Sequence, residues 1–294
     1  MPHILKNRNL EIYIDLPEEN YTFSRFDWTG KISKVSFLGV PVSTNERTDD
    51  MDENLFGKAF YNEFGIETAL GFEDVEIGDW FHKIGVGLLK KTGKVYDFYK
   101  KYDIQPAKFE VINKPNQVVI ISKSEAKSGY SYILKKRITL LESGFNIDYS
   151  LQNTGDKNIV TDEYVHNFTA INNDLMGINY VLKFPFQLNS QSFNEIVNSE
   201  QKIDIVGDSM KFNGSPKEQF FFSNITGNNY EVAKWQLLNL KSKIAISESA
   251  TFSTNKINVW GWEHVISPEL FHKIHVKPGD TIEWSRTYNI MCID

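Results

Sequence analysis

The chain has 294 residues, of which 41% are hydrophobic and 14% aromatic, so a folded protein with a substantial core is expected and disorder is excluded. The formal net charge of -6 argues against nucleic acid or an anionic membrane surface as the main partner. The single cysteine, Cys292, excludes an internal disulfide and is compatible with a reducing compartment. No apolar run has the length of a signal peptide or a membrane span. We therefore expect a soluble cytoplasmic protein, either a monomer or a homodimer.

Apolar and polar residues alternate with a period of two from about Leu10 to Ile290, which is typical of β-strands half-buried in a sheet. In chain order we predict an aromatic-rich loop at 52–65, hairpins at 108–122 and 132–151, a strand at 179–188 and a last strand at 281–290. Turn sequences such as KPNQ, ESG, NTGD and KPGD separate these runs. There is no internal repeat, flexible linker or long amphipathic helix. The sequence predicts an all-β protein, one large antiparallel β-sandwich domain over residues 1–294.

Two polar residues fall on the apolar face of their predicted strands. In DEYVHNFTAIN, His166 shares a face with Tyr164 and Phe168. It is either a core histidine with one hydrogen bond or an imidazole at the floor of an aromatic cleft, where it could transfer a proton. Arg286 shares a face with Trp284, so it must be paired or reach a ligand. A structural ion pair, with Glu263 as a plausible partner, is the favoured interpretation for this arginine.

Other histidines give no metal site. His82 and Lys83 precede a Gly-x-Gly in GDWFHKIGVGLL, but no strand-to-helix context makes this a phosphate loop. His264, His272 and His275 are spread along a strand and turn without the spacing of zinc ligands. We expect neither a metal nor a cofactor.

The stretch VWGWEHVISPELF, residues 259–271, places Glu263 beside Trp262, just before a Ser-Pro-Glu sequence that we interpret as a turn. The carboxylate is either a solvated acid at a strand end or a proton-transfer group in a sugar site walled by tryptophan rings. The residues alone favour the solvated acid.

Several segments resemble the aldose 1-epimerase (galactose mutarotase-like) family, in the family's order. They are GKISKVSFLGV near the N-terminus, RITLLESGFNIDYSLQNTG followed by YVHNF in the middle, and WGWEHVISPELFHKIHVKPGDTIEWSRTYNI at the end. The resemblance implies a galactose mutarotase-like supersandwich with a sugar cleft. It places the catalytic histidine at His166 and the catalytic glutamate at Glu263, with Pro268 and Glu269 as the Pro-acid pair that follows.

The resemblance implies a cofactor-independent mutarotase that interconverts the α and β anomers of a free aldose. Glu263 would be the base toward O1 and His166 the acid toward O5. In the family a second histidine, in a His-Gly-x-x-Arg setting, binds the sugar; FHKIGVG lacks that glycine and arginine, so His82 or Lys83 would stand in for it. Asn167, Trp262 and Arg286 are further candidates for sugar binding. The alternatives are a non-catalytic carbohydrate-binding protein on the same fold, a hexose-phosphate epimerase, and a polysaccharide lyase or glycosidase.

Overall fold

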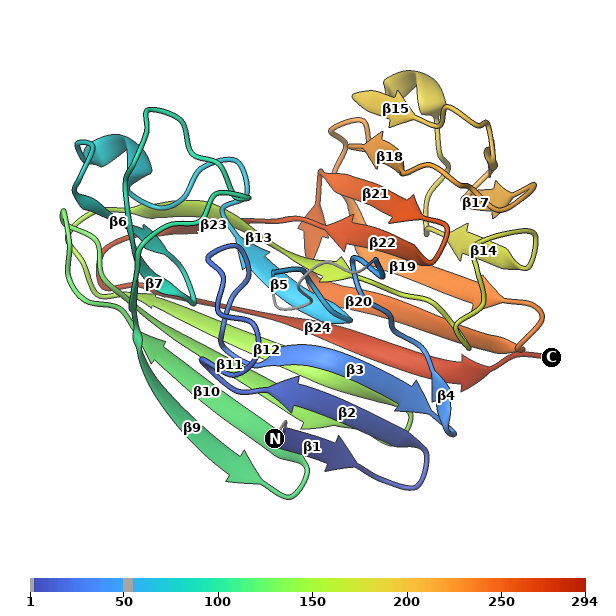
Figure 1. Ribbon diagram of the computed structural model, residues 1–294, viewed down its shortest axis with the longest axis horizontal. Coiled ribbons are helices and arrows are strands. Elements are labelled where there is room, and N and C mark those ends of the chain that lie inside the picture. The colour runs from blue at the N-terminus through green and yellow to red at the C-terminus, as the bar shows by residue number, and fades with distance from the viewer. Residues whose placement is uncertain (1–2, 50–54) are drawn as a thin grey trace.

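The computed structural model describes residues 3–49 and 55–294, which form an all-β structure of stacked antiparallel sheets (Figure 1). Within these residues the non-strand elements are two short 3-10 turns, η1 (Phe72–Asp74) and η2 (Ser190–Ser192). Among the same residues, none of the helical segments is long and apolar enough to cross a membrane. The antiparallel β-sandwich expected from the sequence is confirmed.

The larger layer is a ten-stranded sheet, within which the chain's last strand, β24, lies between β12 and β20. The order across this sheet is β16 (Ile203–Val206), β17 (Ser209–Phe212), β14 (Tyr180–Lys183), β19 (Glu231–Asn239), β20 (Ile244–Thr254), β24 (Thr281–Cys292), β12 (Gly144–Asn153), β11 (Tyr132–Leu140), β10 (Gln117–Lys123) and β9 (Lys108–Lys114). Both predicted hairpins are confirmed, as β9–β10 and β11–β12.

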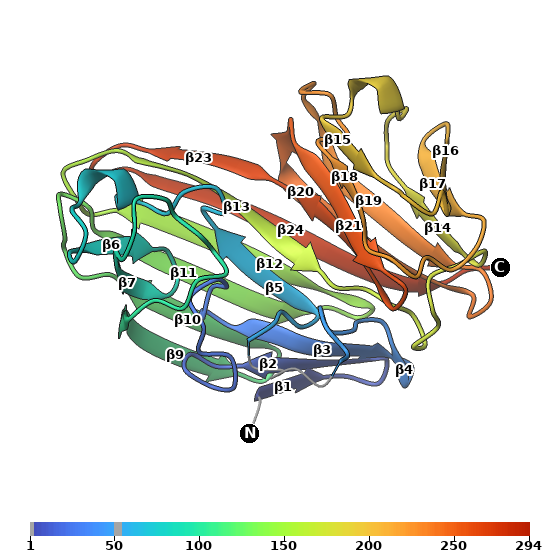
Figure 2. The ribbon, with the colours of Figure 1, turned by 45° about the horizontal axis from the view of Figure 1, so that its top comes forward.

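A seven-stranded sheet lies over one face of the large sheet, as the turned view shows (Figure 2). Its order is β1 (His3–Lys6), β2 (Leu10–Asp15), β3 (Lys31–Phe37), β5 (Phe60–Phe64), β13 (Ile159–Asn167) and β23 (His272–Val276), with β4 (Val40–Pro41) paired to β3. The two sheets meet through large side chains: the ring of Phe60 is 5.4 Å from that of Phe145 and 4.8 Å from that of Tyr288. Burial of such rings is the main driving force for stacking sheets.

The described residues also form two small sheets. One has the order β15 (Glu195–Val197), β18 (Phe220–Ser223), β21 (Ile257–Trp262) and β22 (Val265–Leu270). The other has the order β6 (Trp80–Lys83), β7 (Gly87–Lys90) and β8 (Ile104–Pro106). A β-bridge between Thr169 and Ile266 joins β22 to the residues that follow β13.

The structure differs from the sequence predictions in three segments. The strand predicted at 179–188 is strand only over Tyr180–Lys183, and residues 184–188 have no regular structure. The predicted loop at 52–65 contains the fully buried strand β5, which pairs with β13. Phe60 packs on the large sheet, and Tyr61 on the opposite face packs on Phe26. Residues 52–54 lie outside the described residues. The predicted Ser-Pro-Glu turn is strand, since Ser267, Pro268 and Glu269 belong to β22. Proline is tolerated there because β22 is the last strand of its sheet.

Candidate functional site

A pocket of about 180 Å³ opens where β13 meets the β21–β22 hairpin. Its walls are mainly aromatic and its floor is charged. The lining residues are Arg25, Glu46, Ile66, Phe98, Tyr99, His166, Phe221, Asn258, Trp260 and Glu269. Pockets for drug-sized ligands usually measure about 300–1,000 Å³. This pocket therefore suits one small ring better than a polymer.

His166 is held rigidly at the floor of this pocket. It lies on β13, is 6% exposed, and stacks on Phe168 at 5.0 Å between ring centroids. The edge of the ring meets Phe26 at 5.5 Å. Residues two apart on a strand share a face, which is why the alternation in the sequence already grouped His166 with Phe168. Packing of this kind fixes the ring's orientation.

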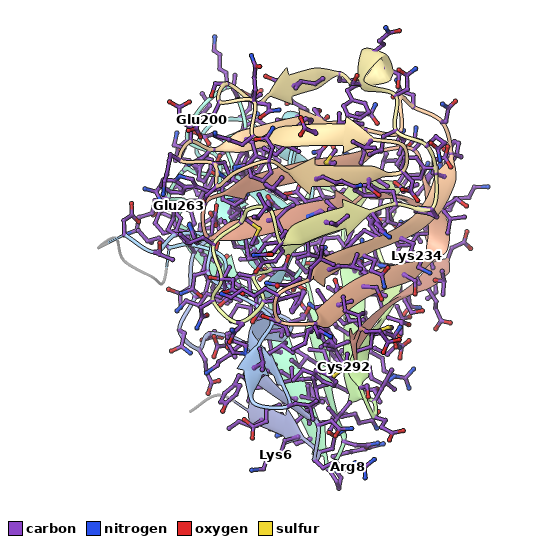
Figure 3. The ribbon with its side chains drawn as sticks, turned by 90° about the vertical axis from the view of Figure 1, so that its right-hand side faces the viewer. Lys6, Arg8, Glu200, Lys234, Glu263 and Cys292 are labelled. Atoms are coloured by element: carbon purple, nitrogen blue, oxygen red, sulfur yellow. The ribbon has the colours of Figure 1, made fainter. Side chains whose placement is uncertain are left out.

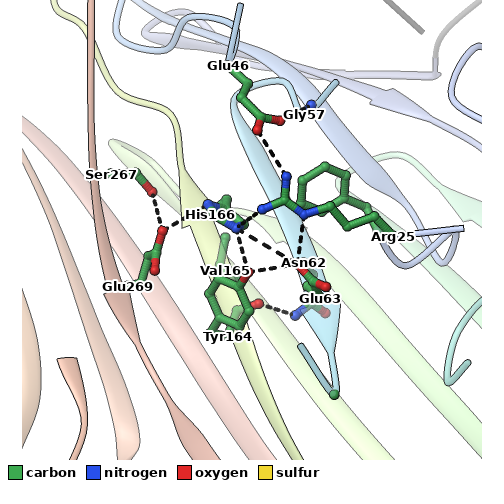
Figure 4. A network of polar contacts seen from close by, with 12 residues as sticks. Arg25, Glu46, Gly57, Asn62, Glu63, Tyr164, Val165, His166, Ser267 and Glu269 are labelled. Atoms are coloured by element: carbon green, nitrogen blue, oxygen red, sulfur yellow. Dashed lines mark hydrogen bonds and ion pairs between the residues drawn. The ribbon is translucent and has the colours of Figure 1, made fainter. Parts of the chain in front are cut away.

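The Nε2 atom of His166 faces two hydrogen-bonding groups inside the protein (Figure 4). A terminal nitrogen of Arg25 lies 2.8 Å away and the hydroxyl of Tyr164 lies 2.5 Å away. A guanidinium can only donate, so Nε2 accepts from Arg25 in the neutral ring. In this sugar-free arrangement the proton of the neutral ring is then on Nδ1.

The Nδ1 atom of His166 faces a carboxylate, that of Glu269 on β22. Nδ1 is 2.9 Å from Oε1 of Glu269, and the contact is poorly aligned, so Nδ1 has no hydrogen-bond partner. Glu269 is 3% exposed and receives a long hydrogen bond from the hydroxyl of Ser267, at 3.4 Å. A buried carboxylate and an unpartnered imidazole nitrogen thus stand side by side in the pocket. Groups of this kind are equipped to move protons.

Arg25 is the cation of the site and is almost fully buried. It donates to Glu46 at 3.0 Å and to Glu63 at 3.1 Å, and its guanidinium lies 4.7 Å from the centre of the Phe98 ring. Burial acts to lower the pKa of Arg25, but Glu46 and Glu63 outweigh it and hold the pKa well above its usual value. The second oxygen of Glu46 accepts from the backbone of Gly57. The guanidinium is therefore a fixed positive charge.

Glu263 lies outside this pocket. It follows β21 in the turn that leads to β22, at the surface of the molecule (Figure 3), and its Oε2 accepts from Lys217 at 2.9 Å. Because Ser267–Glu269 is strand and not turn, the hairpin turns at Glu263 and delivers Glu269 to His166. The structure thus brings His166 together with Glu269 and not with Glu263.

His82 and Lys83 also lie outside the pocket, on β6. His82 packs on Tyr130 and Tyr132, and burial lowers its pKa to about 4. Lys83 is buried against Glu63, with Nζ 3.2 Å from Oε1. Neither side chain is among the residues that line the pocket.

Asn167 and Arg286 belong to a second buried polar cluster, between the two large sheets. Asn167 donates to Glu248 at 2.9 Å and accepts from Tyr288 at 2.8 Å. Arg286 is fully buried and makes two bonds to Glu163, at 3.1 and 2.7 Å, and another to Glu248. The structural ion pair favoured from the sequence is present, but its partners are Glu163 and Glu248 in place of Glu263.

Trp262 stands on the same strand as the pocket residue Trp260 but does not line the pocket. Its Nε1 donates to the backbone of Lys217 at 2.7 Å, and Arg47 lies 5.5 Å from its ring centre.

Sequence reasoning missed Arg25, although a lone arginine among aromatics in YTFSRFDW was a signal in a chain with few arginines. Among the described residues, no group of three or more His, Cys, Asp or Glu side chains could hold a metal ion.

No protein-family model matches the chain, and no curated protein matches its sequence. Solved structures match over nearly its whole length. A galactose mutarotase related enzyme from Lactobacillus acidophilus is 12% identical, with a TM-score of 0.61, covering 100% of this chain and 99% of that one. A galactose mutarotase-like protein from Lactobacillus casei is 13% identical, with a TM-score of 0.58, covering 99% of this chain and 100% of that one.

An aldose epimerase homologue from C. elegans is 12% identical, with a TM-score of 0.58, and the match covers 100% of each chain. At such identities the similarity concerns the fold and not the chemistry. The chain has the fold of the galactose mutarotase-like proteins.

Proposed function

We propose that the protein is a cofactor-independent mutarotase that interconverts the anomers of a free aldose, with Glu269 as base and His166 as acid. The observation that carries this proposal is the His166–Glu269 pair at the floor of a ring-sized pocket, 2.9 Å between Nδ1 and Oε1. Glu269 takes the role that the family resemblance implied for Glu263, because Glu269 is the carboxylate beside the imidazole. A cytoplasmic location and a single domain over residues 1–294 remain part of the proposal.

The reaction needs two proton transfers. Glu269 takes the proton of the C1 hydroxyl while the C1–O5 bond breaks, and its electron pair stays on O5. The imidazolium of His166 gives its Nδ1 proton to O5, which yields the open-chain aldehyde; the ring keeps its Nε2 proton, directed at the Tyr164 oxygen, until closure. Rotation about C1–C2 presents the other face, and closure returns each proton to its donor. O1 and O5 are bonded to the same carbon, so an acid and a base that stand side by side reach both. Each typically contributes a factor of about 10² to 10⁴.

The charges around the pocket favour a neutral sugar over a phosphorylated one. Arg25 is the cation that lines the pocket, and it is already paired with Glu46 and Glu63. Glu269 adds a further carboxylate to the lining. A phosphate would find Arg25 already paired and the Glu269 carboxylate beside it, whereas the hydroxyls of a neutral sugar can donate to that carboxylate. Trp260 and Phe98 line the walls, where aromatic faces suit the apolar side of a pyranose.

A non-catalytic carbohydrate-binding protein is the second candidate. It is favoured by the position of His82 and Lys83, which are buried away from the pocket lining. His166 is then the one histidine among the lining residues, and its Nε2 already faces Arg25 and not the pocket.

The test is polarimetry of freshly dissolved α-glucose, α-galactose and a small panel of other aldoses, with and without the protein. We expect faster approach to the anomeric equilibrium for at least one sugar, and no saturable binding of its 6-phosphate. Saturable binding of a sugar without any acceleration would establish the binding protein instead. Faster anomerisation of a hexose phosphate than of the free hexose would contradict the charge argument.

A further inference from the structure

A line of buried polar contacts leads from Lys83, outside the pocket, to His166 at its floor (Figure 4 shows its last steps). Lys83 and Glu63 are 1% and 0% exposed, with Nζ 3.2 Å from Oε1. The other oxygen of Glu63 accepts from the Tyr164 hydroxyl at 2.7 Å. That hydroxyl lies 2.5 Å from Nε2 of His166.

The Tyr164 hydroxyl has a single proton, and the direction in which it is donated determines whether the Tyr164 oxygen can accept a hydrogen bond from Nε2 of His166. When the phenol donates its proton to Glu63, its oxygen can only accept toward His166. An Nε2–H of the imidazolium then finds an acceptor inside the protein. If Glu63 were uncharged, the phenol would donate to Nε2 and favour the neutral ring.

The remaining charges around His166 act in both directions. Arg25 donates to Nε2 and so favours the neutral ring, with Glu46 one contact further away. Glu63, at 3.9 Å from Nε2, and Glu269, beside Nδ1, favour the imidazolium. Burial acts to raise the pKa of Glu63, but Lys83 and Arg25 outweigh it and lower that pKa. Lys83 therefore helps to keep Glu63 ionised.

We propose that Lys83 is a positioning residue for His166: through Glu63 it keeps the Tyr164 oxygen an acceptor, and so allows His166 to take the protonated form. The catalytic meaning of this arrangement rests on the proposed mutarotase function. The effect of Lys83 on the protonation of His166 does not rest on that function, because a proton on His166 can be observed without any sugar.

The experiment is ¹⁵N NMR of the histidine side chains in the ¹⁵N-histidine-labelled full-length protein. The chain has six histidines, and His166→Asn identifies the signal of His166 by its loss. Lys83→Met removes the charge and keeps an unbranched side chain only one atom shorter. We expect the imidazolium signal of His166 to form only at a pH at least one unit lower in this variant than in the wild-type protein. If the wild-type protein is an active mutarotase, kcat should also fall at least tenfold, with KM within a few-fold.

Two further variants keep the result decisive. Tyr164→Phe removes the acceptor without leaving a charge unpaired, and should shift the His166 signal in the same direction even if Lys83→Met folds poorly. Tyr96→Phe is the matched control, because the Tyr96 hydroxyl contacts Lys83 at 2.9 Å and is no part of the line to His166. It should leave the His166 signal unchanged.

In folded Lys83→Met, a His166 imidazolium signal that is unchanged, or that forms at higher pH because a nearby cation is gone, would overturn the positioning role. A shift in Tyr164→Phe alone would overturn it as well. A shift in both variants, in a wild-type protein that accelerates no aldose, would support the positioning role and remove the proposed function.

Discussion

Glu269 and Glu263 stand on the same hairpin but in opposite surroundings: Glu269 is buried against His166, and Glu263 pairs with Lys217 at the surface. If Glu269 is the base, Glu269→Gln should lower kcat by about 10² or more while sugar affinity stays within a few-fold, because glutamine cannot accept the O1 proton. Glu263→Gln should change the unfolding free energy by less than about 0.5 kcal/mol and leave the rate unaltered. Polarimetric kinetics and urea unfolding of both variants measure these effects. A large rate loss at Glu263 with normal turnover at Glu269 would contradict our assignment.

His166→Asn tests the acid. Asparagine keeps a polar side chain at the pocket floor but cannot give a proton to O5, so most mutarotation should disappear while the protein stays folded. Circular dichroism and polarimetry of the same sample measure the two effects. If the variant unfolds and its folded fraction turns over normally, His166 is a core residue and not the acid.

Arg286 should be a large contributor to stability. Arg286→Met leaves Glu163 and Glu248 buried without their shared cation, which typically costs about 3–5 kcal/mol. Arg137→Met is the matched control, since Arg137 forms an exposed pair with Asp148 on a neighbouring strand of the same large sheet. It should cost less than about 1 kcal/mol. Urea unfolding of both variants compares them; equal losses would show that the buried cluster is dispensable.

His82 should make stability sensitive to mild acid. Its folded pKa is about 4 because of burial, while an unfolded histidine titrates near 6.5. Between these values the unfolded chain binds a proton that the folded protein does not, so stability is lost as the pH falls from about 6.5 toward 4. For one group the loss is roughly 3 kcal/mol. Urea unfolding at several pH values should show a shallower pH dependence in His82→Gln than in the wild-type protein. His275→Gln, at an exposed position, should match the wild type.

The single-domain proposal predicts one cooperative thermal transition with a mostly β circular-dichroism spectrum. Differential scanning calorimetry with matching calorimetric and van't Hoff enthalpies is the measurement. Two separated transitions would divide the chain into independent units.

The sequence predicted those strands in which neighbouring residues alternate between a buried and an exposed face. Alternation in 132–151 reflects strands with one buried face, and alternation at the start of 108–122 reflects a strand with one half-buried face; alternation also placed His166 among aromatics. It failed at β5, which is buried on both faces and so shows no alternation, while its phenylalanines repeat at helical spacing. It also took Ser267–Glu269 for a turn, because proline and serine in an edge strand look like turn residues.

The polar contacts of the site were beyond sequence reasoning for a different reason. Arg25 and His166 are 141 positions apart in the chain and meet only because the segment before β3 folds over β13. The same holds for Lys83, whose partners are Glu63 on β5 and Tyr96 in the loop between β7 and β8. No local pattern encodes such long-range pairings.

The position of β24 has a consequence for how the protein forms. This strand follows all the others in sequence, yet it joins the β9–β12 half of the large sheet to the half that contains β19 and β20. During synthesis the two halves must wait, with facing edges unpaired, until β24 leaves the ribosome. Arg286 arrives with it, so Glu163 and Glu248 gain their cation at the same moment. Pairings between distant segments slow folding, and open strand edges attract other chains. A nascent chain stalled just before Thr281 should therefore depend on chaperones far more than the finished one.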